Sequence, residues 1–283
     1  MSQFATYPSF SEFPYWYQIA CFALFGLCIG SFLNVCIYRI PAGRSLLRPG
    51  SSCQCGERIK PWDNIPVLSW FLLRGKARCC HAPISKRYPA IEALTAVLFI
   101  LCWLRLPFPI SAAYSAFAAC LLAGSVIDLD HTVLPDRFTI GLAVAGLIVS
   151  GLIPGIHLVG RPPGGWWTWH AFYLGIVGLA GGTTIIAWLM FLGEMVLGRE
   201  VMGQGDIKLM GAIGAWTGVS GSIAAIFLGC CAGSLLIAAC MALRIRVPKE
   251  IPFGPMLATG AVAWVLLPHT FPWFAALASF ASA

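Results

Sequence analysis

Long apolar stretches are the feature that most constrains how this chain can fold. The sequence has 283 residues, of which 59% are hydrophobic and only 10% are charged, a composition outside the range of soluble globular domains. About 20 consecutive apolar residues can cross the hydrocarbon of a bilayer as one helix. We therefore predict an all-α polytopic membrane protein with about eight transmembrane helices, over residues 17–37, 89–104, 109–127, 138–153, 171–192, 207–219, 222–243 and 255–267. The sixth of these is short and rich in glycine, and we expect it to be kinked or only partly inserted.

One sizeable polar segment interrupts the apolar stretches. Residues 38–88 are rich in Pro, Gly, Arg and Cys, which predicts a small loop subdomain between the first and second helices. We therefore expect three parts: residues 1–37 as the first transmembrane helix, 38–88 as a cysteine loop subdomain, and 89–283 as the main membrane domain.

The basic residues predict an orientation. With the amino terminus outside, sixteen of the 18 Lys and Arg residues fall in inward loops, and ten of these lie between Arg39 and Arg87. Basic loops resist translocation, so this arrangement is strongly favoured. The first basic residue, Arg39, follows the first apolar stretch, so we expect that stretch to remain in the membrane and not to be a cleaved signal peptide. The net charge of +7 then follows from topology, with anionic membrane lipid as the expected neighbour and no nucleic acid partner.

Two short acidic segments lie where apolar stretches meet loops. They are IDLDHTVLPD at residues 127–136 and GQGDIKL at 203–209, in a chain with only 11 Asp plus Glu. Carboxylates at a membrane boundary are costly and usually indicate function. The predicted topology places both segments at the same face of the membrane. Asp128 and Asp206 are therefore a candidate pair, because two adjacent carboxyl groups share a proton and can act together as acid and base.

Spacing alone leaves other acids open for the first position. Asp130 and Asp136 compete with Asp128, and Asp136 also precedes a helical stretch, which predicts that it is an N-cap. Around Asp206, the flanking Gly203 and Gly205 would let the backbone turn sharply and a substrate approach closely. Lys208 could pair with an acid or extend to the membrane surface.

Four of the twelve cysteines lie in the polar segment: Cys53, Cys55, Cys79 and Cys80. In a reducing compartment such residues favour metal binding over disulfides, and four thiolates suit a tetrahedral zinc ion. The adjacent Cys79 and Cys80 are an awkward pair for one ion, and His81 is an alternative ligand. The other eight cysteines read as small apolar residues.

Six segments together resemble a known family. They are GSFLNVCIYRIP at residues 30–41, NIPVLSW at 64–70, ISKRYPAIE at 84–92, DLDHTVLPD at 128–136, GQGDIKL at 203–209 and IPFGP at 251–255. In this order they resemble the bacterial type IV prepilin peptidases, across residues 26–267. The resemblance implies an inner-membrane aspartyl endopeptidase that cuts basic leaders from prepilins or pseudopilins after a glycine, at the cytoplasmic face. It also implies that Asp128 and Asp206 are the catalytic acids, that residues 89–283 form the protease domain, and that proteolysis needs no cofactor.

The same resemblance implies a second activity. Many members of the family methylate the new amino terminus with S-adenosylmethionine, and their cysteine loop is tied to that reaction. The family pattern has CxxC twice, whereas this chain has Cys53-Gln54-Cys55 and carries Ala77 where the first cysteine of the second pair would stand. Gly75 and Glu92 lie in the matching segments and are minor candidates for methyl transfer.

Two other classes of protein would fit part of the pattern. An ion- or solute-coupled transporter would also have many spans and boundary carboxylates, but transport sites tend to lie at midplane on broken helices related by internal repeats. Here the acids can all be placed at loops or span ends, and no internal repeat is evident. A metal-dependent assembly protein would use the loop cysteines and need no catalytic acids.

Overall fold

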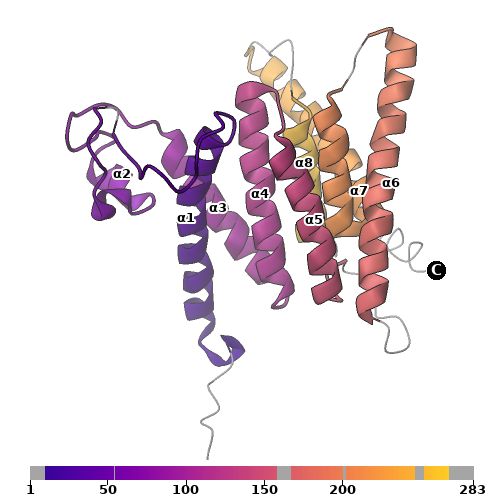
Figure 1. Cartoon of the computed structure of the whole chain (residues 1–283), viewed down its shortest axis with the longest axis horizontal. Helices are drawn as coiled ribbons and strands as arrows, with labels where there is room; N and C mark the ends of the chain where they lie inside the picture. The colour runs from indigo at the N-terminus through magenta and orange to yellow at the C-terminus, as the bar shows by residue number, and fades with distance from the viewer. Residues whose placement is uncertain (1–9, 54, 158–166, 200–201, 246–251, 268–283) are drawn as a thin grey trace, which may run out of the picture. The chain divides into compact units, whose positions relative to one another are not determined.

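The computed structural model describes residues 10–53, 55–157, 167–199, 202–245 and 252–267 (Figure 1). These residues form helices and no strand, with only two isolated bridges, at Ser52 and Arg58 and at Lys76 and Pro83. The chain divides into two compact units, Met1–Ser115 and Ala116–Ala283. The helices are η1 (Phe10–Glu12), α1 (Tyr15–Arg39), η2 (Pro61–Asn64), α2 (Leu68–Leu72), α3 (Arg87–Arg105), α4 (Ile110–His131), α5 (Asp136–Leu152), α6 (Trp167–Leu197), α7 (Gln204–Ala242) and α8 (Gly254–Leu266).

Every predicted span coincides with a helix. Five helices in the described part of the chain, namely α1, α3, α4, α6 and α7, are long and apolar enough to cross a membrane, and α8 is a shorter apolar helix. The remaining predicted span, residues 138–153, corresponds to α5. The prediction of an all-α polytopic membrane protein is confirmed.

The 39-residue helix α7 is two helices joined at Gly218. Gly218 has φ 73° and ψ −177°, a backbone conformation that favours glycine. The chain bends back there, because a Cβ added to Gly214 would lie 2.8 Å from Ser222 Oγ, whereas eight residues of straight helix span about 12 Å. The predicted sixth and seventh spans, 207–219 and 222–243, are therefore the two arms of α7, and the predicted kink lies near the end of the sixth.

In the first unit, α1 and α3 pack closely through glycine. A Cβ on Gly26 would lie 2.7 Å from the Cα of Ala96, and a Cβ on Gly30 would lie 2.7 Å from the Cα of Glu92. Further along α1, the Asn34 amide donates to the carbonyl of Tyr88 at 3.2 Å. The partners fall back along α3 as α1 advances, so the two helices are antiparallel. Small residues allow this approach within lipid.

In the second unit, α7 packs against α5, α6 and α8. Glycines again mark the contacts: Gly178 of α6 has no room for a Cβ against the backbone of Gly214, and a Cβ on Gly229 would lie 2.7 Å from the carbonyl oxygen of Met256 in α8. The Trp216 indole donates to the Leu142 carbonyl at 2.8 Å and joins α7 to α5. These contacts hold the first turns of α7 and α8 close to the end of α4, where the acidic segments lie.

Candidate functional site

Asp128 lies in the last turn of α4 and is buried, with 6% of its surface exposed. Its carboxylate accepts a hydrogen bond from the backbone amide of Gly254, the first residue of α8. The approach is close: a Cβ added to Gly254 would lie 2.5 Å from Asp128 Oδ2. The start of α8 therefore holds this carboxylate in place, and helix N-termini favour negative charge.

Asp206 lies in the first turn of α7 and is also buried, with 8% exposed. Its carboxylate accepts a hydrogen bond from the backbone of Gly203, the residue that caps the helix in an extended conformation. Asp206 and Asp128 are close enough to interact electrostatically. The structure thus brings together, from the ends of two helices, the two acids that the sequence paired.

The competing acids are elsewhere. Asp130, two residues after Asp128, is exposed, because side chains two positions apart on a helix point about 200° from each other. Asp136 is also exposed and pairs with Lys208, whose Nζ lies 2.6 Å from Asp136 Oδ1. The prediction that Asp136 is an N-cap is wrong by one position: Pro135 is the cap and Asp136 begins α5.

Leu134 is a packing centre that the sequence did not single out. It is buried, with 8% exposed. Glycine surfaces from three elements surround it: a Cβ on Gly205 would lie 3.1 Å from its Cβ, one on Gly254 would lie 3.3 Å from Cδ1, and one on Gly124 would lie 3.7 Å from Cδ2. The Leu134 side chain therefore packs between α4, α7 and α8 and sets the distances between these helices next to the acids. The available signal was an apolar residue inside a polar turn, followed by Pro135.

Gly254 is the second residue that the sequence analysis missed as part of the site. In the sequence, its segment IPFGP carries a resemblance to a family but no polar side chain that would indicate a site. The close approach to Asp128 joins residues far apart along the chain, and no local pattern predicts such a contact.

This arrangement has the components for acid and base catalysis. Two buried carboxyl groups that interact electrostatically can share one proton, so that one of them acts as a base toward water and the other as an acid toward a carbonyl. The first turns of α7 and α8 supply backbone amides that fix the carboxylates. Neither nucleophile nor metal is needed for such a reaction.

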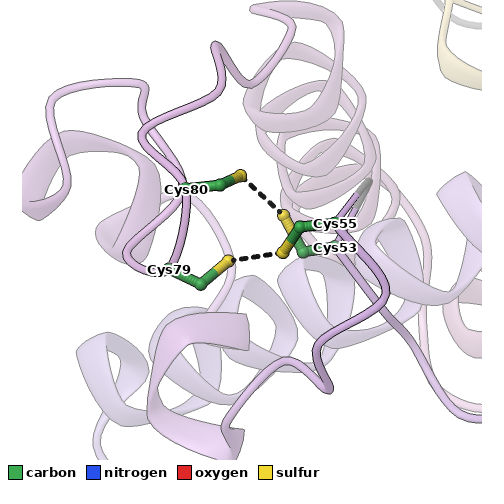
Figure 2. A group of neighbouring side chains, drawn as sticks. All are labelled: Cys53, Cys55, Cys79 and Cys80. Atoms are coloured by element: carbon green, nitrogen blue, oxygen red, sulfur yellow. Dashed lines mark hydrogen bonds between the residues drawn. The ribbon is translucent and has the colours of Figure 1, made fainter.

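The four loop cysteines converge in the first unit (Figure 2). Their sulfur atoms all lie within 4.8 Å of one another. Cys53 Sγ lies 3.4 Å from Cys80 Sγ, and Cys55 Sγ lies 3.3 Å from Cys79 Sγ. The adjacent Cys79 and Cys80 both reach the cluster, and His81 is not a member of the group. The shortened spacing therefore still gathers four sulfur donors.

Hydrogen bonds within the cluster shift the pKa values of its thiols in opposite directions. The backbone of Cys55 and the thiols of Cys79 and Cys80 lower the pKa of Cys53 to about 7. The thiol of Cys79, which hydrogen-bonds to Cys55 and Cys53, has its pKa raised to about 12. Four convergent sulfur donors are the ligand set of a structural zinc site.

Gly75 and Glu92 both hold the backbone around α2. Gly75 has φ 69°, its amide donates to the Trp70 carbonyl at 2.9 Å, and its carbonyl accepts from Ile84 at 2.7 Å. Glu92 is buried, and its Oε2 accepts the backbone amide of Val67 at 2.7 Å. Each therefore has a structural role in the loop, in addition to any role in methyl transfer.

Comparison with known proteins identifies the family. The sequence model described as the type IV leader peptidase family matches residues 115–238, and the one described as the bacterial Peptidase A24 N-terminal domain matches residues 24–106. An Escherichia coli protein named type 4 prepilin-like proteins leader peptide-processing enzyme is 37% identical over 269 residues, which cover 87% of this chain and 93% of the relative. The chain belongs to the type IV leader peptidase family.

Other members of the type IV leader peptidase family are similarly close. A prepilin leader peptidase/N-methyltransferase of Burkholderia pseudomallei is 33% identical over an alignment 284 residues long, which covers 90% of this chain and 87% of the relative. A protein of the same name in Pseudomonas aeruginosa is 34% identical over 281 residues, covering 88% and 89%. No solved structure matches the chain. The family favours a processing enzyme over the transporter and assembly-protein alternatives.

Proposed function

We propose that this chain is a prepilin peptidase in which Asp128 and Asp206 are the catalytic pair. Its substrates would be prepilins or pseudopilins with basic leaders, cut after the glycine that ends the leader. The observation that carries the proposal is the electrostatic interaction between two buried carboxyl groups from α4 and α7. Membership of the leader peptidase family and the names of the relatives support the substrate class.

The reaction would need only water and the two acids. The ionised carboxylate accepts a proton from a water molecule while the oxygen of that water attacks the scissile carbonyl carbon. The protonated partner donates its proton to the carbonyl oxygen. Collapse of the tetrahedral intermediate breaks the C–N bond, and the amine leaves with a proton returned from the pair. Amides of Gly203 and Gly254 hold the carboxylates during these steps.

The location of the reaction is proposed to be the cytoplasmic face of a bacterial inner membrane. The basic loops support this orientation, since placing them inside leaves only two of the 18 Lys and Arg residues outside, and basic loops resist translocation. A prepilin has a basic leader followed by an apolar segment. Acids at the ends of membrane helices can therefore meet the junction between them.

We further propose that the chain methylates the new amino terminus and that the cysteine loop holds structural zinc. The names of the relatives support methylation, and the convergence of Cys53, Cys55, Cys79 and Cys80 supports zinc. Zinc would stabilise a loop with little core of its own. S-adenosylmethionine would supply the methyl group, and Gly75 and Glu92 remain candidates for that site.

The decisive experiment measures both activities together. The purified full chain is incubated with a prepilin, with and without S-adenosylmethionine, and product masses are read by mass spectrometry. We expect loss of the leader in both cases and one added methyl group only with the methyl donor. Asp128→Asn and Asp206→Asn should each lower cleavage by about two orders of magnitude or more, the range of a lost general acid or base.

The matched control is Asp130→Asn, which alters an exposed acid two residues from Asp128 and should leave cleavage near the wild-type level. If Asp128→Asn and Asp206→Asn cleave at wild-type rates, the catalytic assignment is wrong. If only Asp130→Asn loses activity, Asp130 is the first acid.

A further inference from the structure

The short helix α2 presents its large apolar side chains outward. Leu68, Phe71 and Leu72 are 52%, 64% and 73% exposed. Their spacing of three and four residues places them on one face. This is the reverse of a loop that packs against its own core, in which such residues would be covered.

The polar groups of α2 are used inward. Ser69 is buried and its hydroxyl donates to the Trp62 carbonyl at 2.9 Å, while the Trp70 indole donates to the Ile84 carbonyl at 3.0 Å. These bonds fix the rotation of α2. These inward hydrogen bonds therefore keep the apolar face of α2 turned outward. Three large apolar side chains exposed together indicate a binding surface.

The position of α2 along the membrane helices identifies what covers this face. The amide of Val67, which immediately precedes α2, donates to Glu92 Oε2 at 2.7 Å. Glu92 lies inside the candidate span Arg87–Arg105, about 7 Å along α3 from its first residue. It also hydrogen-bonds to Ser31 of α1, about 12 Å from the end of that helix at Arg39. The start of α2 therefore lies beside the end of the α1 and α3 pair (Figure 1), where lipid headgroups meet acyl chains.

The basic residues around α2 also favour a position at the lipid headgroups. Residues 64–91 contain no Asp or Glu but carry Arg74, Lys76, Lys86 and Arg87, together with Arg78, whose guanidinium is paired with Asp63. Arg74 and Lys76 follow α2 directly and are exposed. Apolar side chains beside cations are the pattern of segments that lie in the interface of anionic membranes.

We propose that α2 is an interfacial anchor that rests on anionic lipid. Leu68, Phe71 and Leu72 enter the outer part of the acyl layer, and Arg74 and Lys76 contact phosphate headgroups. Because Gly75 and the bridge between Lys76 and Pro83 connect α2 to the second cysteine pair, the anchor sets the position of the cysteine cluster relative to the membrane surface. This inference does not depend on the proposed catalysis.

Photo-crosslinking in a defined bilayer tests the anchor. The full chain carries benzoylphenylalanine in place of Phe71 or Leu72, which keeps a large apolar side chain at that position. It is reconstituted in nanodiscs of phosphatidylcholine and phosphatidylglycerol and illuminated. The same probe at Leu24, exposed on the transmembrane helix α1, is the positive control, and the probe at Glu57, exposed in the same loop, is the negative control.

We expect phospholipid adducts at Phe71 and Leu72 at yields within a few fold of Leu24, and little adduct at Glu57. The adducts should be enriched in phosphatidylglycerol over the bilayer composition, and the double substitution Arg74→Gln with Lys76→Gln should remove that enrichment. Lipid labelling at Phe71 and Leu72 as low as at Glu57 would overturn the proposal. So would adducts mainly to a second copy of the chain, or to prepilin when it is added.

Discussion

Lys208 Nζ lies 2.6 Å from Asp136 Oδ1, and this ion pair joins the second turn of α7 to the first turn of α5. Both side chains are largely exposed, at 42% and 60%, so the pair adds little to global stability. Its position is what gives it a role, since Lys208 is two residues from Asp206. We infer that the pair helps to hold the start of α7.

Loss of this ion pair should weaken cleavage without unfolding the protein. We expect Lys208→Ala and Asp136→Ala to lower the cleavage rate about two- to fivefold, in line with an exposed pair worth up to about 1 kcal/mol. The double variant Asp136→Lys with Lys208→Asp should be more active than either of its single substitutions. Rates of prepilin cleavage measure this, and additive losses in the double variant would exclude a specific pairing.

Gly254→Ala should disable the acid pair. The new Cβ would lie 2.5 Å from Asp128 Oδ2 and 3.3 Å from Leu134 Cδ1, so the carboxylate must move. Displacement of a catalytic group by about 1 Å can cost about a hundredfold in rate, and we expect a loss of that order. Gly141→Ala, in open space on α5, is the control. A fully active Gly254→Ala would mean that Asp128 tolerates displacement.

The cysteine cluster should contain zinc. We expect about one zinc per chain by plasma mass spectrometry, because four convergent thiolates match a structural site. Cys55→Ser should lose most of the metal and lower methylation, while prepilin cleavage persists, because the proposed catalytic acids lie in the second unit. Cys28→Ser, exposed on α1 and outside the cluster, should keep the metal. Equal zinc content in both variants would place the ion elsewhere.

Gly75→Ala should damage the loop selectively. Gly75 has φ 69°, and a Cβ there would lie 3.0 Å from the Trp70 ring. The left-handed conformation alone costs alanine about 1–2 kcal/mol. We expect reduced methylation and faster proteolysis within residues 38–88, with cleavage of prepilin retained. Gly50→Ala has open space and should behave as wild type. Equal methylation by both variants would contradict this reading.

His157 should make the protein less stable in acid. The imidazole is buried, its Nε2 lies 2.9 Å from the Ala171 carbonyl, and burial lowers its pKa to about 4. Because the unfolded chain binds a proton near pH 6.5 and the folded chain does not, stability falls as pH drops from about 6.5 toward 4.

The comparison that isolates this effect is His157→Gln, which removes the titrating group. The melting temperature of the wild type relative to this variant should decline across the same pH interval, measured in one detergent. A difference that is constant with pH would show that His157 does not titrate in that interval.

Much of the fold was predictable because the thickness of the bilayer sets how long an apolar stretch must be to cross it as a helix. The predicted spans coincide with helices, and the glycine-rich stretch from residue 207 predicted the irregularity at Gly218. Helix spacing could not separate Asp128 from Asp130 in advance, since which face of α4 is buried depends on helices far away in sequence. Only the resemblance to a family favoured Asp128.

The parts that sequence could not supply are long-range contacts and backbone conformations. Gly254 meets Asp128 across more than a hundred residues, and Leu134 packs against three glycines from separate elements. The cysteine spacing counted against a single cluster, yet the backbone turns around Gly56 and His81, both at positive φ, bring all four sulfurs together. Such turns are set by the folded loop as a whole.

The reversal at Gly218 has a consequence for hydrolysis. The arm of α7 that carries Asp206 in its first turn, residues 204–217, is only about 20 Å long, well short of the roughly 30 Å of hydrocarbon in a bilayer. Residues 209–217 of this arm are all buried, so neighbouring helices rather than acyl chains surround it despite its shortness. Gln204 at the start of the arm is exposed, which gives the proposed hydrolysis an aqueous edge beside Asp206 from which water can be supplied.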